Sequence, residues 1–162
     1  MSPEEVIINQ FIEKRLSLAT AESCTGGLIA HRLTNVSGSS NVFIGGIVAY
    51  SNEVKKSLLG VSESILAGLG AVCSDVACEM ALGVCKRLNS DFGIGVTGIA
   101  GPTGGTSTKP VGLVYIAVAS PYFNICKVQK CHFKGTRIEI KQQTADTALN
   151  LLIETINAFN ER

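Results

Sequence analysis

Ser23 and Cys24 are the two nucleophilic side chains whose surroundings in the sequence best suit covalent chemistry. They follow a largely apolar run at 16–21 that is typical of a buried strand, and they precede two glycines and a segment at 28–33 that is typical of a helix. A helix start exposes backbone N–H groups, which attract anions and developing oxyanions. Glycines there let a ligand approach the backbone closely. The alternative is an ordinary capped turn, in which Ser23 or Thr25 is the N-cap.

Lys55 is the second candidate, because it lies early in a predicted helix at 52–59 that follows Ser51, a suitable N-cap. The positive end of the helix dipole and the neighbouring Lys56 both disfavour the ammonium form and so favour a neutral amine. A serine paired with a lysine is a known alternative to a Ser-His-Asp triad. The alternative here is that Lys55 and Lys56 form a solvated helix face.

Glycines are concentrated in and after a predicted strand at 92–97: six of the 17 glycines lie between residues 93 and 105. The segment 93–98 matches Gly-x-Gly-x-x-Gly, but its first two glycines lie within the strand and no helix follows, which argues against a Rossmann site. The loop at 98–110, rich in Gly, Thr and Pro, can instead wrap a phosphate or ribose with N–H groups and hydroxyls. A flexible surface loop is the alternative.

The composition limits the classes of function. The chain has 162 residues, of which 46% are hydrophobic and 17% are charged, and its net charge is +1. These values describe one globular domain, 1–162, and give no support for nucleic acid or a membrane surface as the main partner. The N-terminus lacks the features of a signal peptide, and no apolar stretch approaches the roughly 20 residues of a membrane span. We therefore expect a cytoplasmic protein.

Six cysteines and two histidines are the candidate disulfide partners and metal ligands. A cytoplasmic chain of this size does not need disulfides, so all six thiols are expected to be reduced. No Cys-x-x-Cys occurs, and we expect no metal site. The cysteines are Cys24, Cys73, Cys78, Cys85, Cys126 and Cys131, and the histidines are His31 and His132.

The expected elements alternate between strands and helices over the first two-thirds of the chain. The segment 43–50 is nearly all apolar, as expected of a strand covered on both faces. This alternation predicts a mostly parallel sheet with helices on both sides and an antiparallel hairpin. The expected helices are 3–15, 52–59, a short one from 62 to about 70, 75–88 and a long one after 135, and the other expected strands are 92–97, 111–119 and 125–133.

Four motifs together resemble the CinA C-terminal-domain family, whose characterised members are nicotinamide mononucleotide amidohydrolases (deamidases). The motifs are Ala21-Glu-Ser-Cys-Thr-Gly-Gly-Leu28, Gly45-Gly-Ile-Val-Ala-Tyr-Ser-Asn-Glu-Val-Lys55, Val96-Thr-Gly-Ile-Ala-Gly-Pro102 and Lys109-Pro-Val-Gly112. The resemblance implies a three-layer α/β/α domain with a mixed sheet. Only 20 residues precede the first motif, so we expect a stand-alone form without the pyrophosphatase-type domain of some members.

The resemblance implies that a Ser-Lys acyl-enzyme mechanism hydrolyses the nicotinamide carboxamide. Ser23 is the implied nucleophile, Lys55 the general base and Tyr50 a hydroxyl that assists proton transfer. Ser23 and Lys55 are each followed by a residue that could take the same role, Cys24 and Lys56. Lys56 would point about 100° away from Lys55 on a helix, so only one of them can face the serine. Cys24 shares the helix start, which would lower the pKa of a thiol, but we expect it not to be catalytic.

The resemblance also implies a small-molecule nucleotide as the substrate and no cofactor. Arg137 matches a position that we expect to contact the phosphate, with a surface arginine as the alternative, whereas Lys141 stands where the family often has a second arginine and lacks its bidentate fork. We also expect a homo-oligomer. The rival function is a non-catalytic nucleotide-binding or regulatory module. The expected substrate-binding residues are Cys24, Thr25, Gly26, Gly27, Thr97, Gly98, Gly101 and Arg137.

Overall fold

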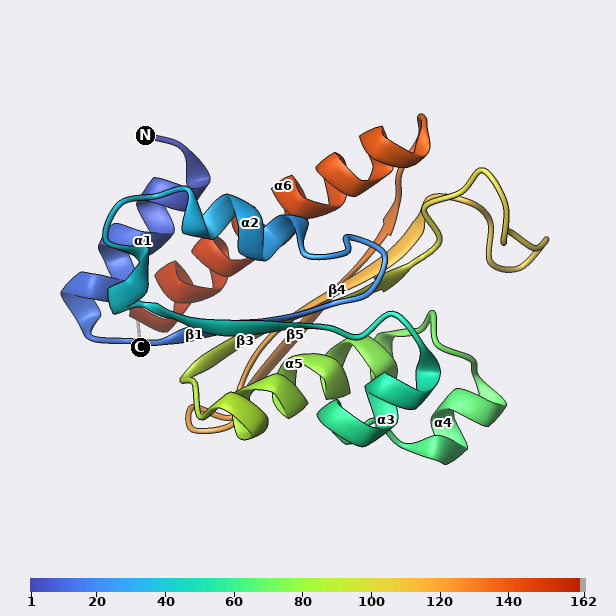
Figure 1. Cartoon of the computed structure of the whole chain (residues 1–162), viewed down its shortest axis with the longest axis horizontal. Coiled ribbons are helices and arrows are strands. Elements are labelled where there is room, and N and C mark those ends of the chain that lie inside the picture. The colour runs from blue at the N-terminus through green and yellow to red at the C-terminus, as the bar shows by residue number, and fades with distance from the viewer. Residues whose placement is uncertain (161–162) are drawn as a thin grey trace.

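Five strands form one mixed sheet in the computed structural model, which describes residues 1–160 (Figure 1). β1 (Leu18–Glu22) lies between β2 (Phe43–Val48) and β3 (Phe92–Gly98) and is parallel to both. β4 (Leu113–Ser120) and β5 (Ile125–His132) extend the sheet beyond β3 as the expected antiparallel hairpin. Four of the five strands therefore run in one direction, and only β4 runs against them. The last two residues of the expected 1–162 domain lie outside the described residues.

Helices cover both faces of the sheet, which confirms the predicted α/β/α class (Figure 1). The larger core lies between the sheet and the helices that carry the two ends of the described chain, and a second core lies under the helices between β2 and β3. Within residues 1–160 there is no helix long and apolar enough to cross a membrane. The first face carries α1 (Pro3–Lys14), α2 (Leu28–Thr34) and α6 (Arg137–Asn160), and the second carries α3 (Asn52–Leu59), α4 (Glu63–Gly68) and α5 (Ser74–Leu88); a short 3₁₀ helix, η1 (Ser39–Asn41), precedes β2.

Local capping fixes the ends of α3. The Ser51 hydroxyl accepts a hydrogen bond from Val54 N at 3.2 Å, and Gly60 ends the helix in the left-handed region at a φ of 69°, as the sequence predicts. At α5 the expected cap is displaced by one residue. Cys73 is the N-cap and makes no side-chain capping bond, so Ser74 lies inside the helix.

β2 is an edge strand, so the expectation that both of its faces are covered is wrong. Its side chains alternate between half-buried and exposed, and Ile44 and Val48 are 52% and 49% exposed. The apolar run matches that of a buried strand, but β1 is its only neighbour in the sheet. Coverage of a strand is set by the elements placed beside it, not by its own composition.

The glycines of β3 have a packing role. A Cβ atom at Gly93 would lie 2.3 Å from the Ala81 carbonyl oxygen, and one at Gly95 would lie 2.3 Å from the Ala77 carbonyl oxygen. α5 therefore approaches the sheet more closely than any side chain on β3 would allow. Packing against α5 thus accounts for the first two glycines of the Gly-x-Gly-x-x-Gly match at 93–98.

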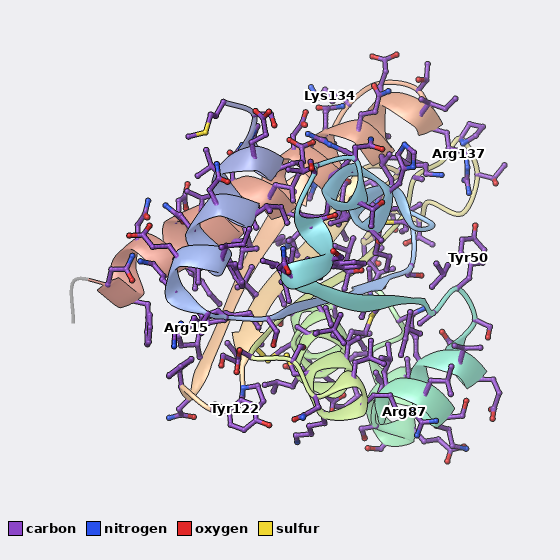
Figure 2. The ribbon with its side chains drawn as sticks, turned by 60° about the vertical axis from the view of Figure 1, so that its left-hand side comes forward. Arg15, Tyr50, Arg87, Tyr122, Lys134 and Arg137 are labelled. Atoms are coloured by element: carbon purple, nitrogen blue, oxygen red, sulfur yellow. A yellow bond between two sulfur atoms is a disulfide. The ribbon has the colours of Figure 1, made fainter. Side chains whose placement is uncertain are left out.

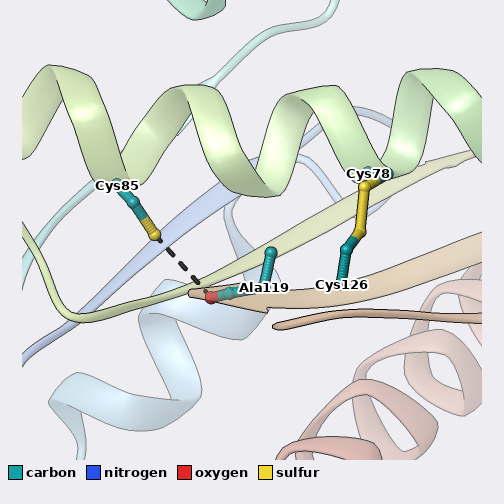
Figure 3. The surroundings of a disulfide bond; sticks show 4 residues. All are labelled: Cys78, Cys85, Ala119 and Cys126. Atoms are coloured by element: carbon teal, nitrogen blue, oxygen red, sulfur yellow. Dashed lines mark hydrogen bonds between the residues drawn. A yellow bond between two sulfur atoms is a disulfide. The ribbon is translucent and has the colours of Figure 1, made fainter. Parts of the chain in front are cut away.

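Cys78 on α5 and Cys126 on β5 form a disulfide, which contradicts the expectation of six reduced thiols (Figure 3). The two residues are 48 positions apart in the sequence, but α5 packs across the sheet so that their Cα atoms lie 6.2 Å apart, within the range that a disulfide bridges. Cys85, further along α5, stays a thiol and donates to the Ala119 carbonyl. Cys24, Cys73 and Cys131 are also free.

Candidate active site

Ser23 and Lys55 meet at the carboxyl ends of β1 and β2. Ser23 directly follows β1, and its backbone N–H donates to the Val96 carbonyl of β3 at 3.0 Å. Lys55 lies four residues after the N-cap of α3, and its Nζ lies 3.0 Å from Ser23 Oγ. The strand-to-turn and strand-to-helix junctions predicted from the sequence therefore converge on one serine–lysine contact.

Lys55 is held in an environment that disfavours its charge. Its side chain is only 2% exposed, and Nζ donates to the carbonyls of Ala49 at 2.9 Å and Tyr50 at 3.2 Å besides contacting Ser23. All three partners are uncharged. Burial lowers the pKa of Lys55 below its usual value. The neutral amine of Lys55 is therefore favoured at a lower pH than that of an exposed lysine. A general base must be neutral to accept a proton.

Lys56 points away from this pocket. Its Nζ lies 3.3 Å from Glu63 Oε2, and its side chain is 45% exposed. The helical register predicted from the Ser51 cap is confirmed, since the two adjacent lysines face opposite environments. Only Lys55 is within hydrogen-bonding distance of Ser23 Oγ.

The turn after β1 is not the ordinary capped turn that was the alternative interpretation of this segment. Gly27, at a φ of 100°, is the N-cap of α2, and neither Ser23 nor Thr25 caps the helix. Instead the buried carboxylate of Glu22 accepts hydrogen bonds from the first turn of α2 and from the Thr25 hydroxyl. Glu22 is not among the site residues predicted from the sequence. The signal for it is an acidic residue at the end of an otherwise mostly apolar strand.

Cys24 is a buried thiol beside the serine. It is 7% exposed, and burial raises its pKa to about 12. The expectation that a helix start lowers this pKa is wrong, because the start of α2 is occupied by Glu22 and desolvation of the thiolate dominates. A thiol with this pKa stays protonated at neutral pH, which makes it a poor nucleophile.

A cavity of about 320 Å³ opens over the Ser23–Lys55 contact. No carboxylate is among the lining residues, and Arg137 carries a positive charge, whereas burial favours the neutral form of Lys55. The excess of positive charge favours an anionic ligand. The lining residues come from the ends of β1, β2 and β3, the α4–α5 connection, the glycine loop and the start of α6; they are Ser23, Cys24, Tyr50, Asn52, Lys55, Ala71, Val72, Thr97, Gly98, Ile99, Ala100, Gly101, Thr103, Gly104 and Arg137.

Two side chains hold the walls of the cavity together. Thr97 at the end of β3 donates from Oγ1 to the Ala71 carbonyl at 2.8 Å. Lys109, at the far end of the glycine loop, donates from Nζ to the Leu69 carbonyl. The α4–α5 connection is thus bound to the end of β3 and to the far end of the glycine loop. The loop is held near its two ends, by Lys109 and by the Gly101 carbonyl that accepts from Arg137, while residues 102–108 between them are exposed.

Arg137 and Tyr50 face one another at the mouth of the cavity (Figure 2). Arg137 Nη2 donates to the Tyr50 hydroxyl at 3.0 Å, and Nη1 donates to the Gly101 carbonyl at 2.7 Å. The Tyr50 side chain is 62% exposed, and its hydroxyl makes no hydrogen bond to Ser23 or Lys55. In this arrangement Tyr50 contacts the lysine through its backbone carbonyl and the arginine through its hydroxyl.

The predicted site residues divide into two groups. Three of them, Thr25, Gly26 and Gly27, do not line the cavity and instead form the turn that carries Ser23. Asn52, Ala71 and Val72 line the cavity and were missed, since nothing in their types or spacing distinguishes them. In residues 1–160 there is no group of three or more His, Cys, Asp or Glu side chains that could hold a metal ion. The residues brought together at the cavity are Ser23, Cys24, Tyr50, Lys55, Thr97, Gly98, Gly101 and Arg137.

Comparison with known sequences identifies the family to which this chain is similar. A family model described as the CinA C-terminal domain matches residues 1–156. A protein of Caldicellulosiruptor saccharolyticus, named for competence-damage induction, is 50% identical over 153 residues, which are 94% of this chain and 37% of that protein. A CinA-like protein of Kosmotoga olearia is 47% identical over 93% of this chain and 36% of its own length. The chain therefore spans little more than a third of these curated relatives.

Two crystal structures show the same fold over nearly the whole chain. The competence/damage inducible protein CihA from Agrobacterium tumefaciens is 42% identical, with a TM-score of 0.91 over 94% of this chain and 92% of that one. The competence damage-inducible protein A from Klebsiella pneumoniae is 29% identical, with a TM-score of 0.91 over 97% and 98% of the two chains. The sheet order and helical layers described above are thus shared with these proteins.

Proposed function

The chain belongs to the CinA C-terminal domain family, and from that premise we propose that it hydrolyses the carboxamide of nicotinamide mononucleotide to nicotinate mononucleotide and ammonia. The observation that carries the proposal is the 3.0 Å contact between Lys55 Nζ and Ser23 Oγ, buried beside a cavity that Arg137 also lines. This contact supports acyl transfer as the reaction class. The choice of substrate rests on the resemblance of the four motifs to the characterised members of the family.

Lys55 acts as the base and then as the acid in this proposal. Its neutral amine takes the proton of Ser23 while the serine oxygen attacks the amide carbon. The ammonium so formed is stabilised by the Ala49 and Tyr50 carbonyls that already accept from Nζ. It returns the proton to the leaving nitrogen, which departs as ammonia when the C–N bond breaks. Water then attacks the acyl-enzyme ester, releases the nicotinate product and restores the Ser23 hydroxyl.

The Cys24 backbone N–H is the proposed donor to the developing oxyanion. Cys24 directly follows the nucleophile and lines the cavity. Its N–H makes no hydrogen bond to another residue in the described part of the chain. A preorganised backbone donor beside the attacked carbonyl stabilises the charge that forms in the transition state without further reorganisation.

Arg137 is the proposed phosphate contact. Both of its current partners, the Tyr50 hydroxyl and the Gly101 carbonyl, are neutral, so a phosphate would be a stronger acceptor for the guanidinium. Lys141, one helical turn further along α6, has Nζ near the Ser23 turn, 3.6 Å from the position that a Cβ on Gly26 would occupy. Lys141 does not line this cavity, so Arg137 alone is the proposed phosphate contact.

Product analysis tests the proposed function against the binding-module alternative. Purified protein should convert nicotinamide mononucleotide into equal amounts of ammonia and nicotinate mononucleotide. Binding of the mononucleotide without release of ammonia would instead favour the non-catalytic module. The two functions differ in turnover and not in ligand, so both quantities are measured on the same preparation.

Arg137→Met is expected to raise KM for nicotinamide mononucleotide by about 10- to 100-fold with a smaller change in kcat, because a charge-assisted contact to the phosphate is lost. Steady-state ammonia release measures both constants. Nicotinamide riboside, which lacks the phosphate, should be processed equally by variant and wild type. Arg87→Met, on the exposed end of α5, is the control. Equal losses on the nucleotide and the riboside would remove Arg137 from the phosphate site.

Cys24→Ser is expected to retain turnover within about tenfold of the wild type, because a thiol with a pKa of about 12 is not the nucleophile. Turnover and labelling by iodoacetamide are measured together. Because Cys24 is buried and stays protonated at neutral pH, iodoacetamide should label it slowly and leave wild-type turnover nearly unchanged. Complete loss of activity in Cys24→Ser would show that the thiol and not Ser23 attacks the substrate.

A further inference from the structure

Glu22 carries a buried carboxylate that the proposed reaction does not use. The residue is 1% exposed. Its Oε1 accepts from Thr25 Oγ1 at 2.7 Å and from Ile29 N at 2.9 Å, and its Oε2 accepts from Ala30 N at 3.0 Å. A buried carboxylate needs such donors, because desolvation of an unpaired charge is costly. All three donors belong to the turn and helix that follow Ser23.

The carboxylate occupies the N-terminus of α2. The first amides of a helix have no acceptor within the helix and attract anions, and the N-cap residue Gly27 offers no side chain to satisfy them. Glu22 supplies the missing acceptor from its place at the end of β1. The amides of Ile29 and Ala30 are therefore bound to the protein's own carboxylate and are not available to a developing oxyanion. The Cys24 N–H, earlier in the turn, is left for that role.

Glu22 and Ser23 project to opposite faces of the sheet. Consecutive residues of an extended strand alternate in direction, so Glu22 faces α2 while Ser23 faces Lys55 on α3. Glu22 does not line the cavity. Any influence on the reaction therefore acts through the backbone of the turn and not through contact with the substrate.

We propose that Glu22 is a positioning residue, which holds the turn so that the Ser23 hydroxyl faces Lys55 and the Cys24 N–H faces the cavity. The turn contains Gly26 and Gly27, both at positive φ, and glycines lose the most conformational freedom on folding. The Val96 carbonyl fixes the turn at its start, and Glu22 fixes its middle through Thr25 and its end through α2. The proposal deepens the proposed function and rests on it.

The test compares Glu22→Ala and Glu22→Gln with the wild type. Loss of the carboxylate should lower kcat by about 10²-fold in Glu22→Ala, because a small displacement of reacting groups has effects of that order. KM should change little, because the cavity contacts are kept. Glu22→Gln keeps one acceptor oxygen but turns an amide N–H₂ toward a backbone donor, so its kcat should fall by about tenfold. Partial rescue by glutamine marks the acceptor role of the side chain.

Asp91→Asn is the matched control. The Asp91 carboxylate accepts from Ser17 N at 2.8 Å and Ser17 Oγ at 3.1 Å, a similar backbone-and-hydroxyl pair at the opposite end of β1. Its loss should lower the midpoint of thermal unfolding without changing kcat. If the Glu22 variants likewise lose thermal stability but keep the wild-type kcat, Glu22 is only a structural cap and the proposal is overturned.

Labelling of Ser23 separates this inference from the proposed function. A fluorophosphonate phosphonylates an activated serine: a bond forms between Ser23 Oγ and phosphorus, fluoride leaves, and the hydroxyl proton passes to Lys55. Mass spectrometry gives the rate, which should fall by about 10²-fold in Glu22→Ala. This result would uphold the positioning role even if the wild type released no ammonia, an outcome that would overturn only the proposed substrate. Equal labelling rates, or no labelling of wild-type Ser23, would refute the positioning role.

Discussion

Ser23→Ala is expected to lower kcat for amide hydrolysis by about 10⁴-fold or more, the order of loss seen when a serine nucleophile is removed. Ser23 Oγ is the hydroxyl that contacts Lys55 Nζ, at 3.0 Å, and it lies beside the cavity. The alanine variant has no group at that position to form the ester intermediate. Binding should survive, because the Arg137 guanidinium and the glycine loop are untouched. Ammonia release and calorimetric titration with the mononucleotide give the two quantities.

Ser90→Ala is the control for loss of a buried serine. Ser90 is fully buried before β3, and its hydroxyl donates to the Phe92 carbonyl at 3.0 Å, so this variant loses a hydrogen bond far from the cavity. It should keep the wild-type kcat. Substantial turnover by Ser23→Ala, with Ser90→Ala equally active, would exclude Ser23 as the nucleophile and leave the cavity with a different chemistry.

Local signals explain why α3 and its two lysines could be predicted from the sequence. Ser51 and Gly60 lie at the two ends of the helix and fix it by hydrogen bonding and by a left-handed backbone. With the ends fixed, the helical period places Lys55 and Lys56 about 100° apart. The choice of the buried lysine then depends only on which one faces the preceding strand. The same reasoning accounts for the correct register of the serine–lysine contact.

β2 and the disulfide depend on distant parts of the chain, and the sequence was misleading for both. The apolar composition of β2 does not reveal that β1 is its only neighbour in the sheet. The pairing of Cys78 with Cys126 requires α5 to cross the sheet toward β5, over a separation of 48 residues. Neither arrangement leaves a local pattern, because each results from packing between elements. Such contacts are found only when the order of the strands is known.

The interpretation of the segment after β1 as a capped turn is wrong for a local reason. Ser23 and Thr25 are standard N-cap residues, and the sequence favoured them over a strand residue. The structure instead uses Glu22, which reaches Ile29 N and Ala30 N because Gly26 and Gly27 fold the chain back at positive φ. The Ser23 hydroxyl is thereby left to contact Lys55.

Lys55→Met is expected to lower kcat by about 10³-fold, within the range that a general base contributes. The amine must be neutral to accept the serine proton, so wild-type activity should rise with pH as Lys55 loses its proton and level off above its pKa. Burial lowers that pKa, so the rising limb should lie at a lower pH than the titration of an exposed lysine. The methionine variant should lose this limb together with most of its turnover. A pH series of single-turnover ammonia release measures both.

Lys56→Met is the matched control, because it removes the adjacent amine and leaves the helix intact. Lys56 forms an exposed ion pair with Glu63 at 3.3 Å, and such a pair contributes only about 0–1 kcal/mol. This variant should keep both the wild-type rate and the rising pH limb. An inactive Lys56→Met beside an active Lys55→Met would assign the base to the other lysine. Equal losses in both variants would mean that the rate depends on the integrity of α3 and not on a neutral amine, because the two substitutions share the helix and differ only in which side chain meets Ser23.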